Sequence, residues 1–224
     1  MDCEEGDGCM KQGQLGMVLL AMGVCGPLLA AQSVHPAAKP GAPAPSTASG
    51  AQHTFHDPTY RISFDYPAKW NFSRRDHELS TFHLDARSAV RTTLLRAVVS
   101  MPENPFPAST FSGAYVYFSV TPHSNDAACA REAGPAVQGK RGGKSEIAGI
   151  SFAHGHDEQT AICTVQRDEV YTTLRHGACY RFDLTINNFC GGEVSGVKDI
   201  TEQELDQVRG RLEAILGSVR FDAK

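Results

Sequence analysis

The chain has 224 residues, a length that suits one domain with appendages, and 41% of them are hydrophobic and 21% charged. These values are close to globular averages, which excludes a chain that is disordered throughout. The formal net charge is -4, and the first 33 residues hold four acids and one base, so the remainder is nearly neutral. The charge gives no reason to expect nucleic acid or an anionic membrane surface as a partner.

The N-terminal part of the chain has the layout of a targeting signal. Within residues 10–33, Lys11 precedes an apolar run that extends from Leu15 to Ala31 and is followed by small residues. This order is typical of a secretory signal peptide, which is removed during export. We therefore predict a periplasmic or secreted protein with no stable membrane insertion after cleavage. The alternative is an uncleaved membrane anchor, because the run has about 17 residues.

The boundaries of the signal follow from the residues around it. Small residues favour cleavage after Ala31 or after Ser33, so we assign residues 1–33 to the signal peptide. Residues 1–9 are acidic, unlike the basic start of such signals, which favours Met10 as the true start of the protein.

The composition changes after the signal. Residues 34–52 are rich in Pro, Ala, Ser and Gly and nearly lack large apolar side chains. Such a segment cannot bury enough surface to order itself, so we expect a flexible, disordered linker. The folded domain is then predicted over residues 53–224, which is long enough to bury a sizeable core.

Strand patterns dominate the first two thirds of this domain. In the opening strand, 60–66, polar residues alternate with four large side chains, Tyr60, Ile62, Phe64 and Tyr66. We expect this face, continued by Trp70 and Phe72, to cover one side of a sheet near a helix. Further strands are predicted at 80–87, 92–101, 113–122 and 146–154. The strand at 113–122 is apolar on both faces, which is typical of a central strand that is covered on each side.

Two helices are predicted. Residues 124–134 begin with Ser and Asn, contain several alanines and end in glycine, which indicates a short helix. The second helix covers 201–216, where Thr201 and Glu204 form a capping box and apolar residues repeat at helical spacing up to a terminating glycine. A short closing strand at 218–221 follows it.

A long hairpin is predicted over residues 163–187. His176 and Gly177 provide its two-residue turn, because the glycine readily takes the positive φ that such turns require. Facing residues then have numbers that sum to 353, so Thr173 faces Tyr180. A bulge near the start of the first strand would shift this register.

Four cysteines lie outside the predicted leader: Cys129, Cys163, Cys179 and Cys190. An even number of cysteines in an exported chain predicts two disulfides, for which three connectivities are possible. The hairpin register places Cys163 opposite Cys190 and favours that pair, which leaves Cys129 with Cys179.

The best candidate for a metal site is the segment His-Gly-His-Asp-Glu at 154–158. His154 and His156 lie on the same side of an extended segment with Asp157 nearby, and imidazole with carboxylate suits zinc or copper. The polar end of a strand is the favoured interpretation, because no third ligand is fixed by spacing. We therefore assign no metal ligand and keep these three residues as candidates.

No other motif predicts chemistry. The Gly-Lys-Ser at 143–145 resembles the end of a phosphate-binding loop, but Gln138 stands where that loop needs glycine, and a strand rather than a helix is expected to follow. The sequence lacks the motifs of serine hydrolases and zinc peptidases. We predict no catalytic residue and no cofactor.

Tyr66, Pro67 and Trp70 form a Tyr-Pro-x-x-Trp corner after the opening strand. With the late hairpin, the final amphipathic helix and the closing strand, this corner resembles the PsbP-like family over residues 55–222. The resemblance implies an α+β fold, an α/β/α sandwich around a largely antiparallel sheet, and binding or scaffolding rather than catalysis. The export signal, the linker and the four cysteines depart from the photosynthetic members of the family, so the metal roles of those members are not transferred.

These features predict an exported, non-enzymatic binding or assembly module of the cell envelope, with an envelope protein or a small ligand as its partner. One alternative is a periplasmic metal-binding or hydrolytic protein that uses His154 and His156. Another is a disulfide-stabilised structural domain that binds no ligand.

Overall fold

The computed structural model describes residues 50–75, 77–79, 91–134, 143–191 and 196–223. The predicted signal peptide, most of the predicted linker and the strand expected at 80–87 lie outside these residues. The described elements are, in chain order, β1 (Gln52–Asp57), β2 (Ile62–Pro67), β3 (Asn71–Ser73), β4 (Leu94–Ser100), β5 (Phe111–Thr121), α2 (Asp126–Glu132), β6 (Gly143–Ile147), β7 (Ile150–Ala161), β8 (Thr164–Arg175), β9 (Ala178–Phe189), α4 (Glu202–Leu216) and β10 (Arg220–Phe221). Neither of the two described helices has the length and the apolar character that crossing a membrane requires.

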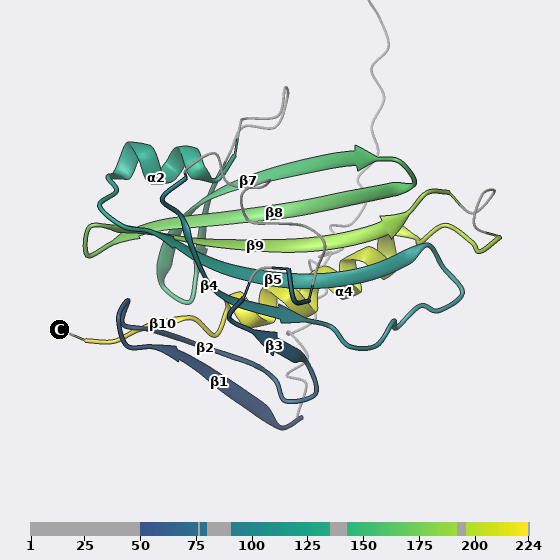
Figure 1. Cartoon of the computed structure of the whole chain (residues 1–224), viewed down its shortest axis with the longest axis horizontal. Helices are drawn as coiled ribbons and strands as arrows, with labels where there is room; N and C mark the ends of the chain where they lie inside the picture. Colours follow the sequence, from purple (N-terminus) through teal and green to yellow (C-terminus); the bar gives the residue numbers. More distant parts are fainter. Residues whose placement is uncertain (1–49, 76, 80–90, 135–142, 192–195, 224) are drawn as a thin grey trace, which may run out of the picture. The chain divides into compact units, whose positions relative to one another are not determined.

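The described strands form two sheets, and their named pairs are antiparallel. A seven-stranded sheet has the order β3-β4-β5-β9-β8-β7-β6, and a three-stranded sheet has the order β1-β2-β10 (Figure 1). The mostly antiparallel α+β fold that the sequence predicted is therefore confirmed. The separation of the opening strand into a second, smaller sheet was not predicted.

The hydrophobic core lies between α4 and the two sheets. Phe64 of β2 is fully buried and packs edge-on against Phe118 of β5 and Phe182 of β9, with ring centroids 6.0 Å apart in both pairs. The apolar stripe of α4 enters the same cluster with Leu205, Val208, Leu212 and Ile215. Each of these buried side chains contributes about 1.5–3 kcal/mol to stability. The predicted aromatic face therefore does cover a sheet next to a helix, although Phe72 at its margin stays 36% exposed.

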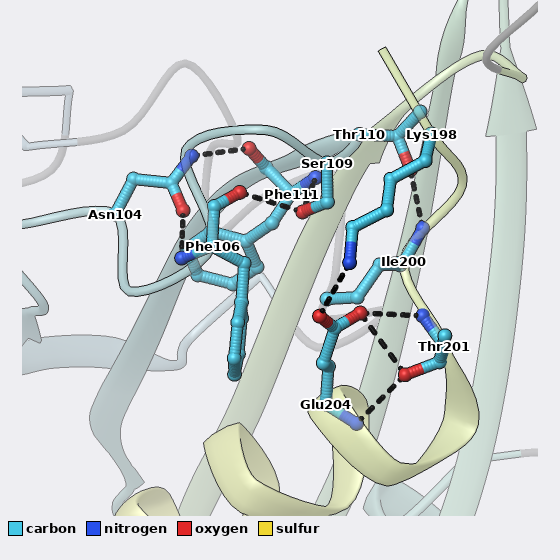
Figure 2. A network of polar contacts seen from close by, with 9 residues as sticks. All are labelled: Asn104, Phe106, Ser109, Thr110, Phe111, Lys198, Ile200, Thr201 and Glu204. Carbon is cyan, nitrogen blue, oxygen red and sulfur yellow. Dashed lines mark hydrogen bonds and ion pairs between the residues drawn. The ribbon is translucent and has the colours of Figure 1, made fainter.

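The start of α4 is held by its own capping box and by the loop that leads into β5 (Figure 2). The N–H of Glu204 donates to Thr201 Oγ1 at 3.2 Å, and the N–H of Thr201 donates to the Glu204 carboxylate at 2.9 Å, as predicted. Thr110 Oγ1 accepts the N–H of Ile200 at 3.1 Å, and Lys198 forms an ion pair with Glu204 at 3.1 Å. These contacts fix the first turn of α4 relative to β5.

β8 and β9 form the predicted hairpin, with His176 and Gly177 at positive φ in the turn. Facing residues have numbers that sum to 353, as predicted. The register continues without a shift from the turn to Thr164, which faces Phe189 at the other end. The turn alone was enough to predict the register, because a slip of one residue would have placed the apolar side of one strand next to the polar side of the other.

Two parts of the sheet differ from the prediction. The single strand expected at 146–154 is the hairpin of β6 and β7, because Ala148 and Gly149 take positive φ and reverse the chain. The other difference is β1, which begins at Gln52, within the predicted linker, and pairs with β2. The Gly-Lys-Ser at 143–145 lies in β6, so it does not start a helix, in agreement with the rejection of a phosphate-binding loop.

Candidate functional site

One face of the seven-stranded sheet is lined by buried polar side chains. It is the side on which α2 contacts β8 and β9, away from the core under α4. We call it the polar face and define it by seven side chains on β5, β8 and β9, each at most 5% exposed: Ser119, Gln166, Asp168, Arg181, Asp183, Thr185 and Asn187.

Strand pairing brings these side chains into adjacent rows. Facing residues of antiparallel strands point to the same side of a sheet. Thr185 of β9 faces Asp168 of β8. Two positions further along, Asn187 faces Gln166. The odd-numbered residues of β9 therefore line the polar face, while its even-numbered aromatic and aliphatic residues enter the core.

Arg181 is the cation among the seven side chains. Its Nε donates to both carboxylate oxygens of Asp183, at 3.1 and 3.0 Å, and its Nη2 donates at 2.6 Å. Burial disfavours the charge of Arg181, but Asp183, with Glu132 and Asp168 close by, outweighs burial and raises the pKa of Arg181. Burial also raises the pKa of Glu132, despite a hydrogen bond from Thr121 at 2.9 Å. Among these described side chains, the acids outnumber Arg181, the cation.

Four buried oxygen atoms of the polar face have no hydrogen-bond partner within the described part of the chain: Ser119 Oγ, Gln166 Oε1, Thr185 Oγ1 and Asn187 Oδ1. Leaving one such atom unpaired in a folded protein costs about 1–3 kcal/mol. The last three belong to adjacent positions of β8 and β9 and form one patch. This patch can accept hydrogen bonds that the described protein groups do not supply.

α2 is fixed directly on the sheet at one end of the polar face. The Oγ1 of Thr172 donates to the carbonyl of Cys129 at 2.8 Å, and Cys129 is disulfide-bonded to Cys179, as predicted. Gly155 of β7 lies under the end of the helix, where an added Cβ would stand 1.9 Å from the carbonyl oxygen of Ala133. The Thr172 hydroxyl, on the same side of the sheet, therefore has a backbone hydrogen-bond partner, unlike the Thr185 hydroxyl within the described ranges.

The two candidate histidines lie on the other side of β7, at the margin of the core. His154 and His156 share a side, as predicted, and both contact Glu169 of β8: its Oε2 is 2.7 Å from His154 Nε2 and its Oε1 is 2.9 Å from His156 Nδ1. Asp157 points to the opposite side of the strand, where its carboxylate accepts a hydrogen bond from Gln159 at 2.9 Å. The strand therefore separates Asp157 from the two histidines.

This arrangement gives no support to a metal site. In the described ranges, no group of three or more His, Cys, Asp or Glu side chains is placed to hold a metal ion. Each carboxylate oxygen of Glu169 already pairs with an imidazole nitrogen, so these groups face one another rather than a common point. Burial alone would raise the pKa of Glu169, but the hydrogen bonds and charges of the two histidines outweigh it and hold that pKa below its ordinary value.

The polar face was not predicted from the sequence. β9 alternates apolar and polar residues, a pattern that is typical of a strand with one side in water. In the structure the polar side is buried as well. The burial of this side could have been inferred from the strand predicted at 113–122, which is apolar on both faces. It pairs with β9, so a cover over both sides of the sheet extends to β9 as well.

No family model and no curated protein matches the chain. The solved structures that are similar to it include the following three. A crystal structure of a protein from Bacteroides thetaiotaomicron has a TM-score of 0.43 and 11% identity, with 76% of this chain and 48% of that chain covered, so this chain spans about half its length. The solution structure of cyanobacterial PsbP (CyanoP) from Synechocystis has a TM-score of 0.41 and 13% identity, with 82% of this chain and 100% of that chain covered. LpqN of Mycobacterium tuberculosis, described as involved in cell envelope biogenesis, has a TM-score of 0.39 and 10% identity, with 80% and 88% covered.

One of these three structures is a PsbP protein, from the family that the sequence resembles. Similarities this low concern the arrangement of strands and helices. Nothing about binding or activity follows from them.

Proposed function

We propose that this chain is an exported, non-enzymatic binding module of the cell envelope, and that its polar face binds a small, hydroxyl-rich ligand without negative charge. One observation carries the proposal: three adjacent buried oxygen atoms, on Gln166, Thr185 and Asn187, lack hydrogen-bond partners within the described residues. The large majority of buried polar side-chain atoms in native proteins have a hydrogen-bond partner, so we propose that a molecule from outside completes the bonds of these three.

The chemistry of the patch defines the class of ligand. Two of its three oxygens are amide carbonyls, which only accept hydrogen bonds, and the third is a hydroxyl. A ligand that presents several O–H or N–H donors matches this set. Among the described side chains, Arg181 already pairs with Asp183 and acids outnumber cations, so we propose that a negatively charged ligand is disfavoured.

Two further features support the export part of the proposal. The leader-like segment at 10–33 precedes the folded domain, and the Cys129–Cys179 disulfide suits an oxidising compartment. We also propose the α/β/α sandwich that the resemblance implies. It is supported by α2 and α4, which contact β9 from its polar and its apolar side.

A pair of isosteric substitutions tests whether the patch is kept for binding. Thr185→Val removes a hydroxyl without a partner among the described residues, so we expect the free energy of unfolding to rise by about 1 kcal/mol. Thr172→Val, on the same face, removes a hydroxyl that is bonded to Cys129, so we expect a loss of about 1 kcal/mol. Urea denaturation of both variants at pH 7 measures the difference, and equal losses would contradict the proposal.

Three sugars of the same ring size test the ligand class. We expect neutral glucose and cationic glucosamine to raise the melting temperature of the wild-type protein and anionic glucuronate to leave it unchanged. Thr185→Val should weaken both responses, while Thr172→Val should keep them if the variant is folded at the assay temperature. No response to glucose or glucosamine would overturn the ligand, and a Thr185→Val variant that is then no more stable than the wild type would assign the patch to bound water.

A further inference from the structure

Cys163 and Cys190 lie side by side at the open end of the long hairpin. Cys163 takes positive φ in the turn between β7 and β8, and Cys190 directly follows β9. Thr164 faces Phe189 as the last named pair of the β8–β9 ladder, so the two cysteines occupy the next facing position. The backbone N–H of Cys190 donates to the carbonyl of Cys163 at 3.0 Å, which shows that the pairing continues to them.

The spacing at this position suits a disulfide. Facing residues of an antiparallel ladder have Cα atoms about 4.5–5.5 Å apart, and disulfides join Cα atoms about 4.4–6.8 Å apart. The ladder therefore brings the two cysteines within the range of Cα separations that a disulfide spans.

The environment of this pair differs from that of the bonded pair. Cys129 and Cys179 are 2% and 0% exposed, between α2 and the sheet. Cys163 is exposed, and its neighbour Ile162 is 98% exposed. Access of an attacking thiolate is one of the conditions that set the rate of thiol–disulfide exchange. The Cys129–Cys179 bond is shielded from small thiols, whereas Cys163 is accessible to them.

We infer that Cys163 and Cys190 form a second, exchangeable disulfide, which is made and broken by thiol–disulfide exchange with a disulfide-bearing partner such as glutathione disulfide or a thiol oxidoreductase. This goes beyond ligand binding at the polar face and does not depend on it. The pair is a redox site at the surface, in contrast to the structural bond between Cys129 and Cys179.

The exchange balances in two steps. The exposed Cys163 thiol loses its proton, and the thiolate attacks one sulfur of the partner's disulfide and releases the other as a thiolate. Cys190 then loses its proton and attacks the mixed disulfide at the Cys163 sulfur, which releases the second partner thiolate. The two cysteines give up two electrons and two protons, and the partner disulfide is reduced to two thiols. Reduction follows the same steps backwards.

Differential alkylation tests this inference on the full chain with Cys3, Cys9 and Cys25 changed to Ser. The protein is equilibrated in glutathione buffers of graded redox ratio, quenched with acid, and treated with N-ethylmaleimide before peptide mass mapping. We expect Cys163 and Cys190 to become protected together in one transition. The Cys129–Cys179 bond should open only at a ratio of reductant to oxidant that is higher by about tenfold or more.

Variants separate the pair from independent thiols. In Cys190→Ser we expect a stable mixed disulfide between Cys163 and glutathione, and Thr164→Ser, in the adjacent ladder position, should keep the wild-type transition. The inference is overturned if Cys163 and Cys190 both carry glutathione in the wild-type background, if both stay alkylated under excess glutathione disulfide, or if either pairs with Cys129 or Cys179.

Discussion

At the scale of single residues, Glu169 has the most consequential surroundings outside the polar face. Its side chain is 17% exposed, and its carboxylate contacts the imidazole rings of both candidate metal ligands, His154 and His156. Glu213 of α4 belongs to the same group, because burial, with the charge of Glu169 as a lesser cause, raises the pKa of Glu213. Glu169 lies on another strand, so the spacing around His154 and His156 could not predict its contact with them. Its carboxylate orients both imidazole rings and links β7 to β8.

Glu169→Gln tests this role through pH. The pKa of Glu169 is lowered in the folded state, so its stabilisation is present above the ordinary glutamate value of 4.5 and is lost as the pH falls through the lowered pKa. We expect the variant to lose about 1–2 kcal/mol of unfolding free energy at pH 7 and the gap to wild type to shrink below pH 4.5. Urea denaturation across this range measures it.

The matched control is Glu158→Gln, which changes a carboxylate on the neighbouring strand β7 that pairs with Arg167 of β8 and is 47% exposed. An exposed pair of this kind contributes little, so we expect a loss below about 1 kcal/mol. A gap between Glu169→Gln and wild type that does not change with pH would contradict the assigned role of the charge.

At the scale of elements, the position of α2 on the sheet depends on Gly155 of β7. Gly155 of β7 lets the carbonyl of Ala133 approach the strand, and Cys129 and Thr172 fix the preceding turn. A helix of seven residues has few contacts of its own, so its position follows from these three attachments to the sheet. The helix bounds the end of the polar face that contains Thr172.

Gly155→Ala tests this close approach. A Cβ at this position meets backbone rather than a flexible side chain, so either the strand or α2 must move. We expect a loss of about 1–3 kcal/mol in the free energy of unfolding, as for other overpacked sites. Gly143→Ala, on the neighbouring strand β6, meets nothing within 4 Å and should stay within about 0.5 kcal/mol of wild type. Similar values for both variants would refute the contact between α2 and β7.

At the scale of the whole molecule, the proposal rests on export. The leader pattern is a property of the sequence and lies outside the described residues. The folded part adds a buried disulfide, which an oxidising compartment allows to form. The compartment therefore decides the oxidation state of both cysteine pairs. The mass of the mature protein reports the cleavage site and the number of disulfides in one measurement.

Expression of the full chain in a bacterium with a periplasm tests this link. We expect a periplasmic protein that begins at Gln32 or Val34, whose intact mass rises on reduction by two hydrogens for each disulfide. Leu20→Arg, which places a charge in the apolar run, should keep the protein in the cytosol, whereas Leu20→Ile should not. A cytosolic wild-type protein with an intact leader and free thiols would refute export.

The sequence by itself determined the features whose information is local. The turn at His176 and Gly177, the capping box of Thr201 and Glu204 and the alternation around Phe64 each lie within a few residues, so their patterns suffice to predict hairpin, helix and buried face. The tertiary structure alone decided which polar residues are buried. Thr185, Gln166 and Asn187 look like the solvent side of two strands until the sheet and its covering segments are assembled, because burial depends on contacts between segments far apart in the chain.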